Sequence, residues 1–131
     1  MTTKLEKSTE ARVNYEEILK SLDNIRDAAI ADAATIRKVA EINAEEIYKM
    51  TVESASAIYT TATNEEEKES AQAILDMALA SAEEVRMIAL KSALVAHGTT
   101  VTSIKQNYIM EEKAAWDDYR KIVTDLNKFL F

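Results

Sequence analysis

Residues 25–68 decide the fold, and in blocks of eleven they read IRDAAIADAAT, IRKVAEINAEE, IYKMTVESASA and IYTTATNEEEK. Isoleucine opens every block, and alanine recurs eleven residues apart at Ala33, Ala44 and Ala55. Eleven residues in three turns is about 3.67 per turn, close to the 3.6 of a straight helix, whereas heptads impose a left-handed supercoil. The repeat therefore predicts one long helix whose contact stripe stays nearly parallel to its axis.

The rest of the composition agrees with long helices. The chain has 131 residues, with one glycine, no proline and no cysteine. Sheet folds need turns at regular short intervals, and those turns use glycine, proline and asparagine. Without cysteine there is no disulfide and no thiolate metal site. We therefore predict an all-α protein that forms a single elongated domain over 1–131.

Two interruptions divide the predicted helices. At Thr60–Glu67 the apolar period stops, and Asn64 with Glu67 three residues later is typical of a helix N-terminus. At Gly98 the glycine indicates a left-handed helix end, where the preceding His97 would interact with the last carbonyls. These signals predict three antiparallel helices near 9–61, 65–97 and 100–130, in an alanine-rich hendecad hairpin or bundle.

The stripe predicts which residues form helix–helix contacts. Small residues let helix axes approach closely, and isoleucines three turns apart act as knobs on a neighbouring helix. The predicted interface residues are Ile18, Leu22, Ile25, Ala29, Ala33, Ile36, Ala40, Ala44, Ile47, Ala55, Ile58, Ile74, Ala78, Ala82, Val85, Ala89 and Ala93.

Helix lengths point to self-association. At about 1.5 Å per residue the first predicted helix is about 80 Å long and the other two about 50 Å each, so part of the first stripe would lack cover. Large exposed apolar stripes usually mark interfaces, which favours other copies of the same chain as partners. An ordinary intramolecular hairpin with an alanine-rich seam, or a break near Ser21–Asn24, is the alternative.

Two further groups are candidates for contacts between subunits. Arg26, Arg37, Tyr48 and Tyr59 each follow an isoleucine of the repeat, which favours a position at the edge of the contact and a role in setting register between chains. The C-terminal region is unusually apolar for a chain end, which favours docking on its own bundle or on a neighbour. Its candidate docking residues are Trp116, Tyr119, Phe129, Leu130 and Phe131.

Charge and motifs narrow the function. The net charge of −7 argues against nucleic-acid binding and against adsorption to anionic membranes. There is no apolar run long enough for a transmembrane segment and no signal-peptide core, so we expect a cytoplasmic protein. Adjacent acids such as Glu45 and Glu46 point about 100° apart on a helix and do not converge on one ligand. We therefore expect no enzyme activity, cofactor, metal site or small-molecule ligand.

The pattern favours a structural protein that self-assembles through hendecad helix contacts into a filament, ribbon or rod. Two alternatives stay open. One is a small acidic binding or inhibitor protein, of the kind phages encode, that occupies a basic surface of a protein partner. The other is a coat protein of hydrophobic granules, with the amphipathic face lying on the particle.

Overall fold

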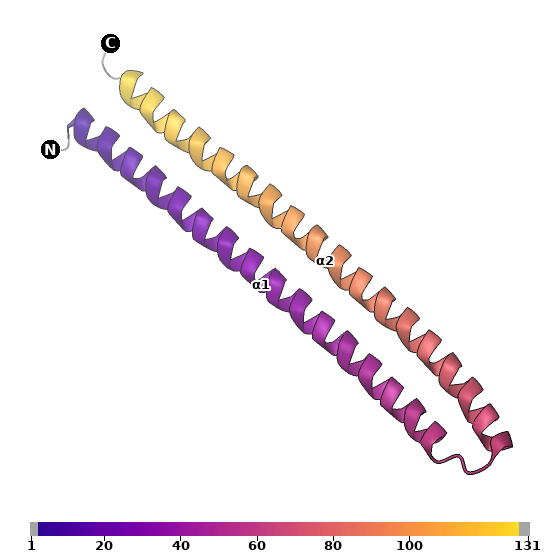
Figure 1. Cartoon of the computed structure of the whole chain (residues 1–131). Helices are drawn as coiled ribbons and strands as arrows, with labels where there is room; N and C mark the ends of the chain where they lie inside the picture. Colours follow the sequence, from indigo (N-terminus) through magenta and orange to yellow (C-terminus); the bar gives the residue numbers. More distant parts are fainter. Residues whose placement is uncertain (1–2, 129–131) are drawn as a thin grey trace. The chain divides into compact units, whose positions relative to one another are not determined.

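Two long helices make up almost all of the described chain. The computed structural model describes residues 3–128, with α1 spanning Lys4–Thr60 and α2 spanning Glu65–Lys128 (Figure 1). The predicted all-α class is confirmed. The predicted break after residue 61 is also confirmed, because α1 ends at Thr60 and α2 begins at Glu65, as the sequence indicated.

The predicted third helix is wrong. Over the described residues, the predicted second and third helices form the single helix α2, which continues through Gly98, and this glycine has no positive φ. A glycine inside a helix costs only about 1 kcal/mol relative to alanine, and packing of the flanking turns outweighs that cost. His97 consequently lies inside α2, and the helix terminus that it was expected to cap does not exist.

Caps fix both helix starts. Asn64 Oδ1 accepts a 2.8 Å hydrogen bond from the Glu67 amide, and Glu67 Oε2 accepts bonds of 3.0 and 2.9 Å from the amide and hydroxyl of Thr63. The cap predicted at Asn64 is therefore confirmed. The same pattern begins α1, where Thr3 Oγ1 accepts a 3.1 Å bond from the Glu6 amide, which explains a start five residues earlier than predicted.

The chain divides into two packing units. Unit 1 comprises Met1–Ala33 and Thr100–Phe131, and unit 2 comprises Ala34–Thr99. Within unit 1, Tyr15 contacts Tyr119 and Asp23 contacts Tyr108, so the two helical segments run antiparallel. Within unit 2 the turn at residues 61–64 makes the end of α1 and the start of α2 antiparallel neighbours.

Because α2 has 64 residues, the uncovered overhang that three helices implied does not arise. Helix length therefore gives no support for self-association.

Alanine forms the core. Among the described residues, the buried apolar side chains are all alanines, and no large side chain is fully buried. The two helices therefore approach closely but enclose almost no apolar volume. The buried residues are Ala33, Ala44, Ala55, Ala71, Ala82, Ala93 and Ala115.

Candidate functional site: an uncharged helix face

The isoleucines of the repeat do not face the opposite helix. Ile36, Ile47 and Ile58 remain 71%, 58% and 51% exposed, whereas Ala44 beside them is 6% exposed. Each isoleucine follows an alanine of the buried row by three residues, which turns the two rows about 60° apart around the helix axis. The alanine row is used inside the chain, and the isoleucine row borders an open face.

In unit 2 that open face carries no charge. On α1 its positions follow steps of 4-3-4-4-3-4, and on α2 a second set follows the same steps. We call these fourteen residues the uncharged face. They are Ile36, Ala40, Asn43, Ile47, Thr51, Ser54 and Ile58 on α1, and Ile74, Ala78, Ser81, Val85, Ala89, Ser92 and Ala96 on α2.

Both halves of the uncharged face lie on the same side of unit 2. On both helices, residues of the face follow the buried alanines by three positions, which sets them about 60° to one side. In two antiparallel neighbours this equal offset turns both rows toward one common side. The hollow near the turn is consistent with this, because Ile58 of α1 and Ile74 of α2 line it together, along with Glu66 and Glu67. Ile74 and Val85 are 50% and 54% exposed, so the α2 half is open as well.

Charged residues occupy several of the corresponding positions in unit 1. Continuing the steps of the repeat leads to Asp32 on α1 and to Glu111 and Asp118 on α2, all exposed. On α1 the charge therefore begins at Asp32, next to unit 2, whereas on α2 the uncharged residues Thr100, Ser103 and Asn107 precede Glu111. In unit 1 a hollow between the helices is lined by Ile25 and Ala29, but Arg26 and Glu111 border it too.

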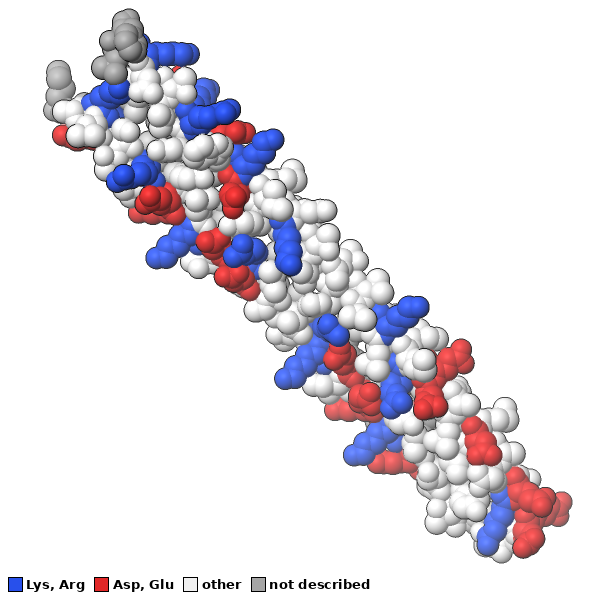
Figure 2. Space-filling view, turned by 45° about the horizontal axis from the view of Figure 1, so that its top comes forward, with Lys and Arg blue, Asp and Glu red and all other residues white. Residues whose placement is uncertain are grey.

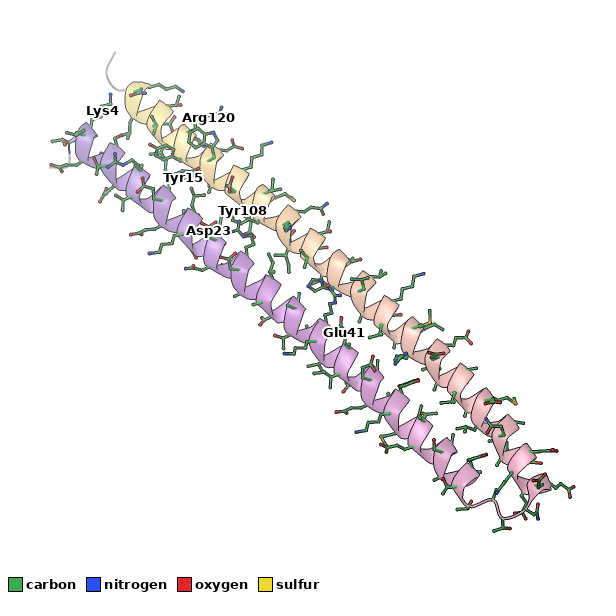
Figure 3. The ribbon with its side chains drawn as sticks, viewed as in Figure 1. Lys4, Tyr15, Asp23, Glu41, Tyr108 and Arg120 are labelled. Carbon is green, nitrogen blue, oxygen red and sulfur yellow. The ribbon has the colours of Figure 1, made fainter. Side chains whose placement is uncertain are left out.

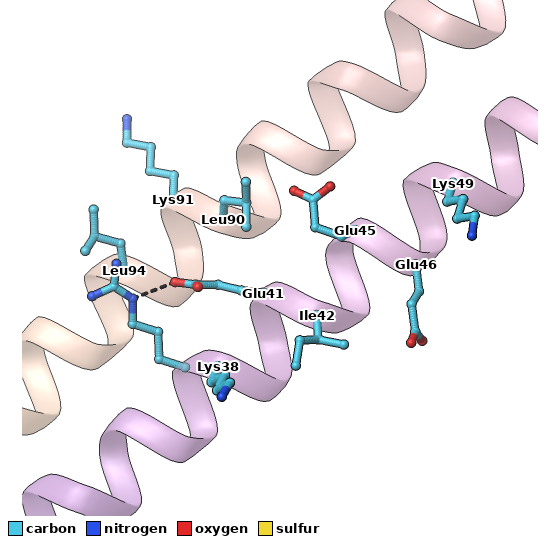
Figure 4. A pocket seen from close by; sticks show the side chains of 10 residues that line it. Lys38, Glu41, Ile42, Glu45, Glu46, Lys49, Leu90, Lys91 and Leu94 are labelled. Carbon is cyan, nitrogen blue, oxygen red and sulfur yellow. Dashed lines mark hydrogen bonds and ion pairs between the residues drawn. The ribbon is translucent and has the colours of Figure 1, made fainter.

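The opposite side of unit 2 is charged. An open groove of about 840 Å³ is lined by apolar residues such as Ile42, Leu90 and Leu94 and by lysines and glutamates around them. Arg37 Nε donates to Glu41 Oε1 at 2.6 Å, the interaction that the dashed line at Glu41 marks in Figure 4. Lys38, Glu46 and Lys49 follow one another along α1 (Figure 4). This arrangement is typical of a solvated helix surface.

In each unit an arginine of one helix stacks on a tyrosine of the other helix. In unit 1 the Arg26 guanidinium lies 4.3 Å from the Tyr108 ring centroid, and in unit 2 that of Arg86 lies 4.0 Å from the Tyr48 centroid. Arg86 also pairs with Glu45 at 3.5 Å. Sequence reasoning missed the role of Arg86, although it stands one residue after Val85 as Arg26 stands after Ile25.

Tyr108 and Asp23 meet across the seam of unit 1, as Figure 3 shows. The Tyr108 hydroxyl donates a 2.5 Å hydrogen bond to Asp23 Oδ1. This bond, with a smaller contribution from the Glu112 carboxylate, raises the pKa of Tyr108 above its usual value. The contact holds two helices together and lies on the surface, which suits a structural role.

The predicted register residues already have partners within the chain. Arg26 pairs with Asp27 at 3.2 Å and Arg37 with Glu41 at 2.6 Å, while Tyr48 stacks with Arg86. Tyr59 is 38% exposed near the end of α1. A role for these four residues between copies stays a prediction.

The aromatic residues predicted to dock are partly engaged within unit 1. Trp116 contacts Tyr15 at 5.7 Å and Tyr119 at 5.8 Å between ring centroids, and it remains 46% exposed. Phe129, Leu130 and Phe131 lie outside the described residues. Docking of this group on a neighbour stays a prediction.

The described residues offer little else for chemistry. Between residues 3 and 128 no group of three His, Cys, Asp or Glu side chains is placed to hold a metal ion. Neither helix has, over its described length, a stretch apolar enough to cross a membrane. On the face drawn in Figure 2, basic and acidic side chains are interspersed, and acids gather near the turn that joins the helices. That surface has no extended basic patch.

Comparison with known proteins gives no family. No protein-family model, curated protein or solved structure matches the chain.

Proposed function

We propose that this protein is a non-enzymatic structural protein that assembles with copies of itself through its long helix faces. The supporting observation is that, over residues 3–128, no large side chain is fully buried. The residues buried in the seam are alanines, while Ile36, Ile47 and Val85 remain more than half exposed. Burial of side chains of this size is the main source of stability in water-soluble folds. Covering these residues with a neighbouring chain would therefore lower the free energy more than covering alanines would.

Surface area supports more than one contact. The chain exposes 10019 Å². A globular monomer of this length exposes roughly 7,000 Å², so the excess is roughly 3,000 Å². A standard protein–protein contact buries about 800 Å² on each partner. The excess is sufficient for several contacts per chain, which favours an extended oligomer such as a filament, ribbon or rod over a closed pair.

The hendecad spacing belongs to the same proposal. Rows eleven residues apart stay nearly parallel to a straight helix axis, so they keep facing one neighbour along the whole row. A contact of this kind extends without a kink, and no proline interrupts it. We expect the isoleucine rows to supply the contact between copies and the alanine rows to supply the contact within one chain.

Light scattering during size-exclusion chromatography, over a series of protein concentrations, tests the assembly. We expect a mass of several chains that grows with concentration, and elongated particles in negative-stain images. A mass of one chain at the highest concentration would overturn the proposal and leave the uncharged face to another occupant. An acidic binding protein or a granule coat would then be the hypothesis to test.

A variant pair locates the contact. Ile36→Asp places a charge in the uncharged face, and we expect the assembled mass to fall toward that of one chain. Asn24→Asp makes the same charge change at an exposed position on the α1 segment of unit 1, outside the uncharged face, and should leave the mass unchanged. Equal masses for the two variants would contradict the assignment.

A further inference from the structure

We infer that the uncharged face of unit 2 is covered by the same face of a second copy, turned by a two-fold axis parallel to the helices. In this arrangement α1 of one copy lies on α2 of the other. The contact forms a bundle of four helices in two layers, in which every neighbouring pair of helices is antiparallel. The inference rests on the proposed function, because it names the partner and the geometry of one contact in the assembly.

The lack of charged residues on the uncharged face indicates which kind of surface covers it. A surface without charges gains most from an uncharged surface, because a charged partner would lose hydration and find no counter-charge. The corresponding positions of unit 1 carry Asp32, Glu111 and Asp118, and the opposite side of unit 2 carries Lys38 and Glu46. Among the described helix faces, the matching surface for the uncharged face is therefore the same face on another chain.

The positions match in height along the helices. Arg86 contacts both Glu45 and Tyr48, so the neighbouring Val85 lies at the level of Ile47. Rotation about an axis parallel to the helices preserves levels, so Ile47 of one copy meets Val85 of the other. The identical steps on both helices bring Ile36 to Ala96 and Ile58 to Ile74 in the same way.

Side-chain size favours this axis over the alternative. The α1 half carries three isoleucines, whereas the α2 half is mostly alanine and serine. Setting α1 on α2 gives both sides of the contact the same side chains, with Ile36 against Ala96, Ile47 against Val85 and Ile58 against Ile74, which keeps the helix spacing even. Setting α1 on α1 would instead gather six isoleucines on one side and leave the two halves richer in alanine and serine together on the other.

The area is that of a stable contact. Each half of the face runs over 23 residues of helix, from Ile36 to Ile58 and from Ile74 to Ala96, or roughly 33 Å, and two helices are about 20 Å wide. The product is roughly 660 Å² per copy, close to the roughly 800 Å² per partner that specific interfaces bury. The charged groove on the opposite side stays open for the further contacts that an extended assembly needs.

Disulfide trapping tests the geometry, because the natural chain contains no cysteine. Ile47→Cys and Val85→Cys are made as separate proteins, one carrying a mass tag, and are mixed, dissociated, reassembled and oxidised. Disulfides require Cα atoms about 4.4–6.8 Å apart, which directly facing positions reach and others do not. We expect the tagged–untagged product in the mixture, and at least tenfold less self-linked product from either variant alone.

Controls make each outcome decisive. Lys49→Cys, on the charged side of α1, is mixed with Val85→Cys and should give no linked product. Each variant is first checked under reducing conditions for the assembled mass of the natural chain, and Ile36→Cys with Ala96→Cys provides a second pair. Self-linking of Ile47→Cys would overturn the α1-on-α2 arrangement, and an assembled but unlinked mixture would overturn the contact. A natural chain that stays monomeric would instead overturn the proposed function.

Discussion

At the residue scale, Tyr108 is the clearest case of a side chain whose titration is tied to folding. Its hydroxyl donates to Asp23, Glu112 lies close by, and the Arg26 guanidinium covers its ring. Both carboxylates disfavour the tyrosinate, so the folded chain holds the proton more tightly than the unfolded chain does. Folding stability from this contact is therefore complete below the ordinary tyrosine pKa and is lost as pH rises above it.

This predicts a steeper loss of stability at high pH in the natural chain than in Tyr108→Phe. The difference should open above pH 10.0, the ordinary tyrosine value, because the variant has no proton to lose. Urea unfolding followed by circular dichroism from about pH 8 to about pH 11 measures it. Tyr59→Phe, which removes a hydroxyl with no hydrogen bond among residues 3–128, is the control and should follow the natural chain. Parallel curves for all three proteins would contradict the prediction.

Alanine suits the seam between the helices because its side chain is small as well as apolar. Ala44 is 6% exposed between the helices of unit 2, with no room for a longer side chain unless the helices separate. Ala44→Leu should therefore lower the free energy of unfolding by about 1–3 kcal/mol, the usual cost of overpacking. Ala57→Leu, an exposed site on the same helix, should change stability by less than about 0.5 kcal/mol. Urea unfolding at low protein concentration compares them, and equal stabilities would count against a tightly packed seam.

At the element scale, the continuity of α2 gives Gly98 a different meaning from the one its sequence context suggests. Its backbone is helical, and a Cβ added there would meet nothing within 4 Å. Glycine therefore contributes only backbone freedom that folding must remove, and nothing in the geometry requires it.

Gly98→Ala should consequently stabilise the protein by about 0.5–1 kcal/mol, because alanine restricts the unfolded chain and favours the helix. Gly98→Pro, by contrast, should destabilise it by about 3 kcal/mol or more, since proline removes a helix hydrogen bond and clashes with the preceding turn. Thermal unfolding by circular dichroism ranks the three proteins. Loss of stability in the alanine variant would indicate a helix end at this position after all.

At the scale of the whole molecule, the net charge of −7 opposes any assembly of like chains. Contacts through an uncharged face are not weakened by salt, whereas repulsion between acidic chains is screened by it. Raising sodium chloride from about 0.05 M to about 0.5 M should therefore increase the assembled mass measured by light scattering. A fall in mass over the same range would show that ion pairs between copies hold the assembly, contrary to the uncharged contact.

Several features were determined by the sequence alone, because they depend on local chemistry. Scarce glycine and absent proline favour helix throughout, and the cap at Asn64 follows from hydrogen bonds within one turn. The repeat likewise identifies which residues share a face, since a shared face depends only on the helical period. Ala33, Ala44 and Ala55 could be grouped in this way before any partner was known.

The tertiary structure decided the rest, because it depends on what lies beside each helix. A period cannot say which of two adjacent rows turns inward, and here the alanine row faces α2 while Ile36 and Ile47 stay exposed. Nor can a single glycine say whether a helix ends, because its cost of about 1 kcal/mol is smaller than the packing energy of the turns around it. The pairing of Arg86 with Tyr48 also needed the opposite helix, since the two residues are distant in sequence and only the antiparallel register brings them together.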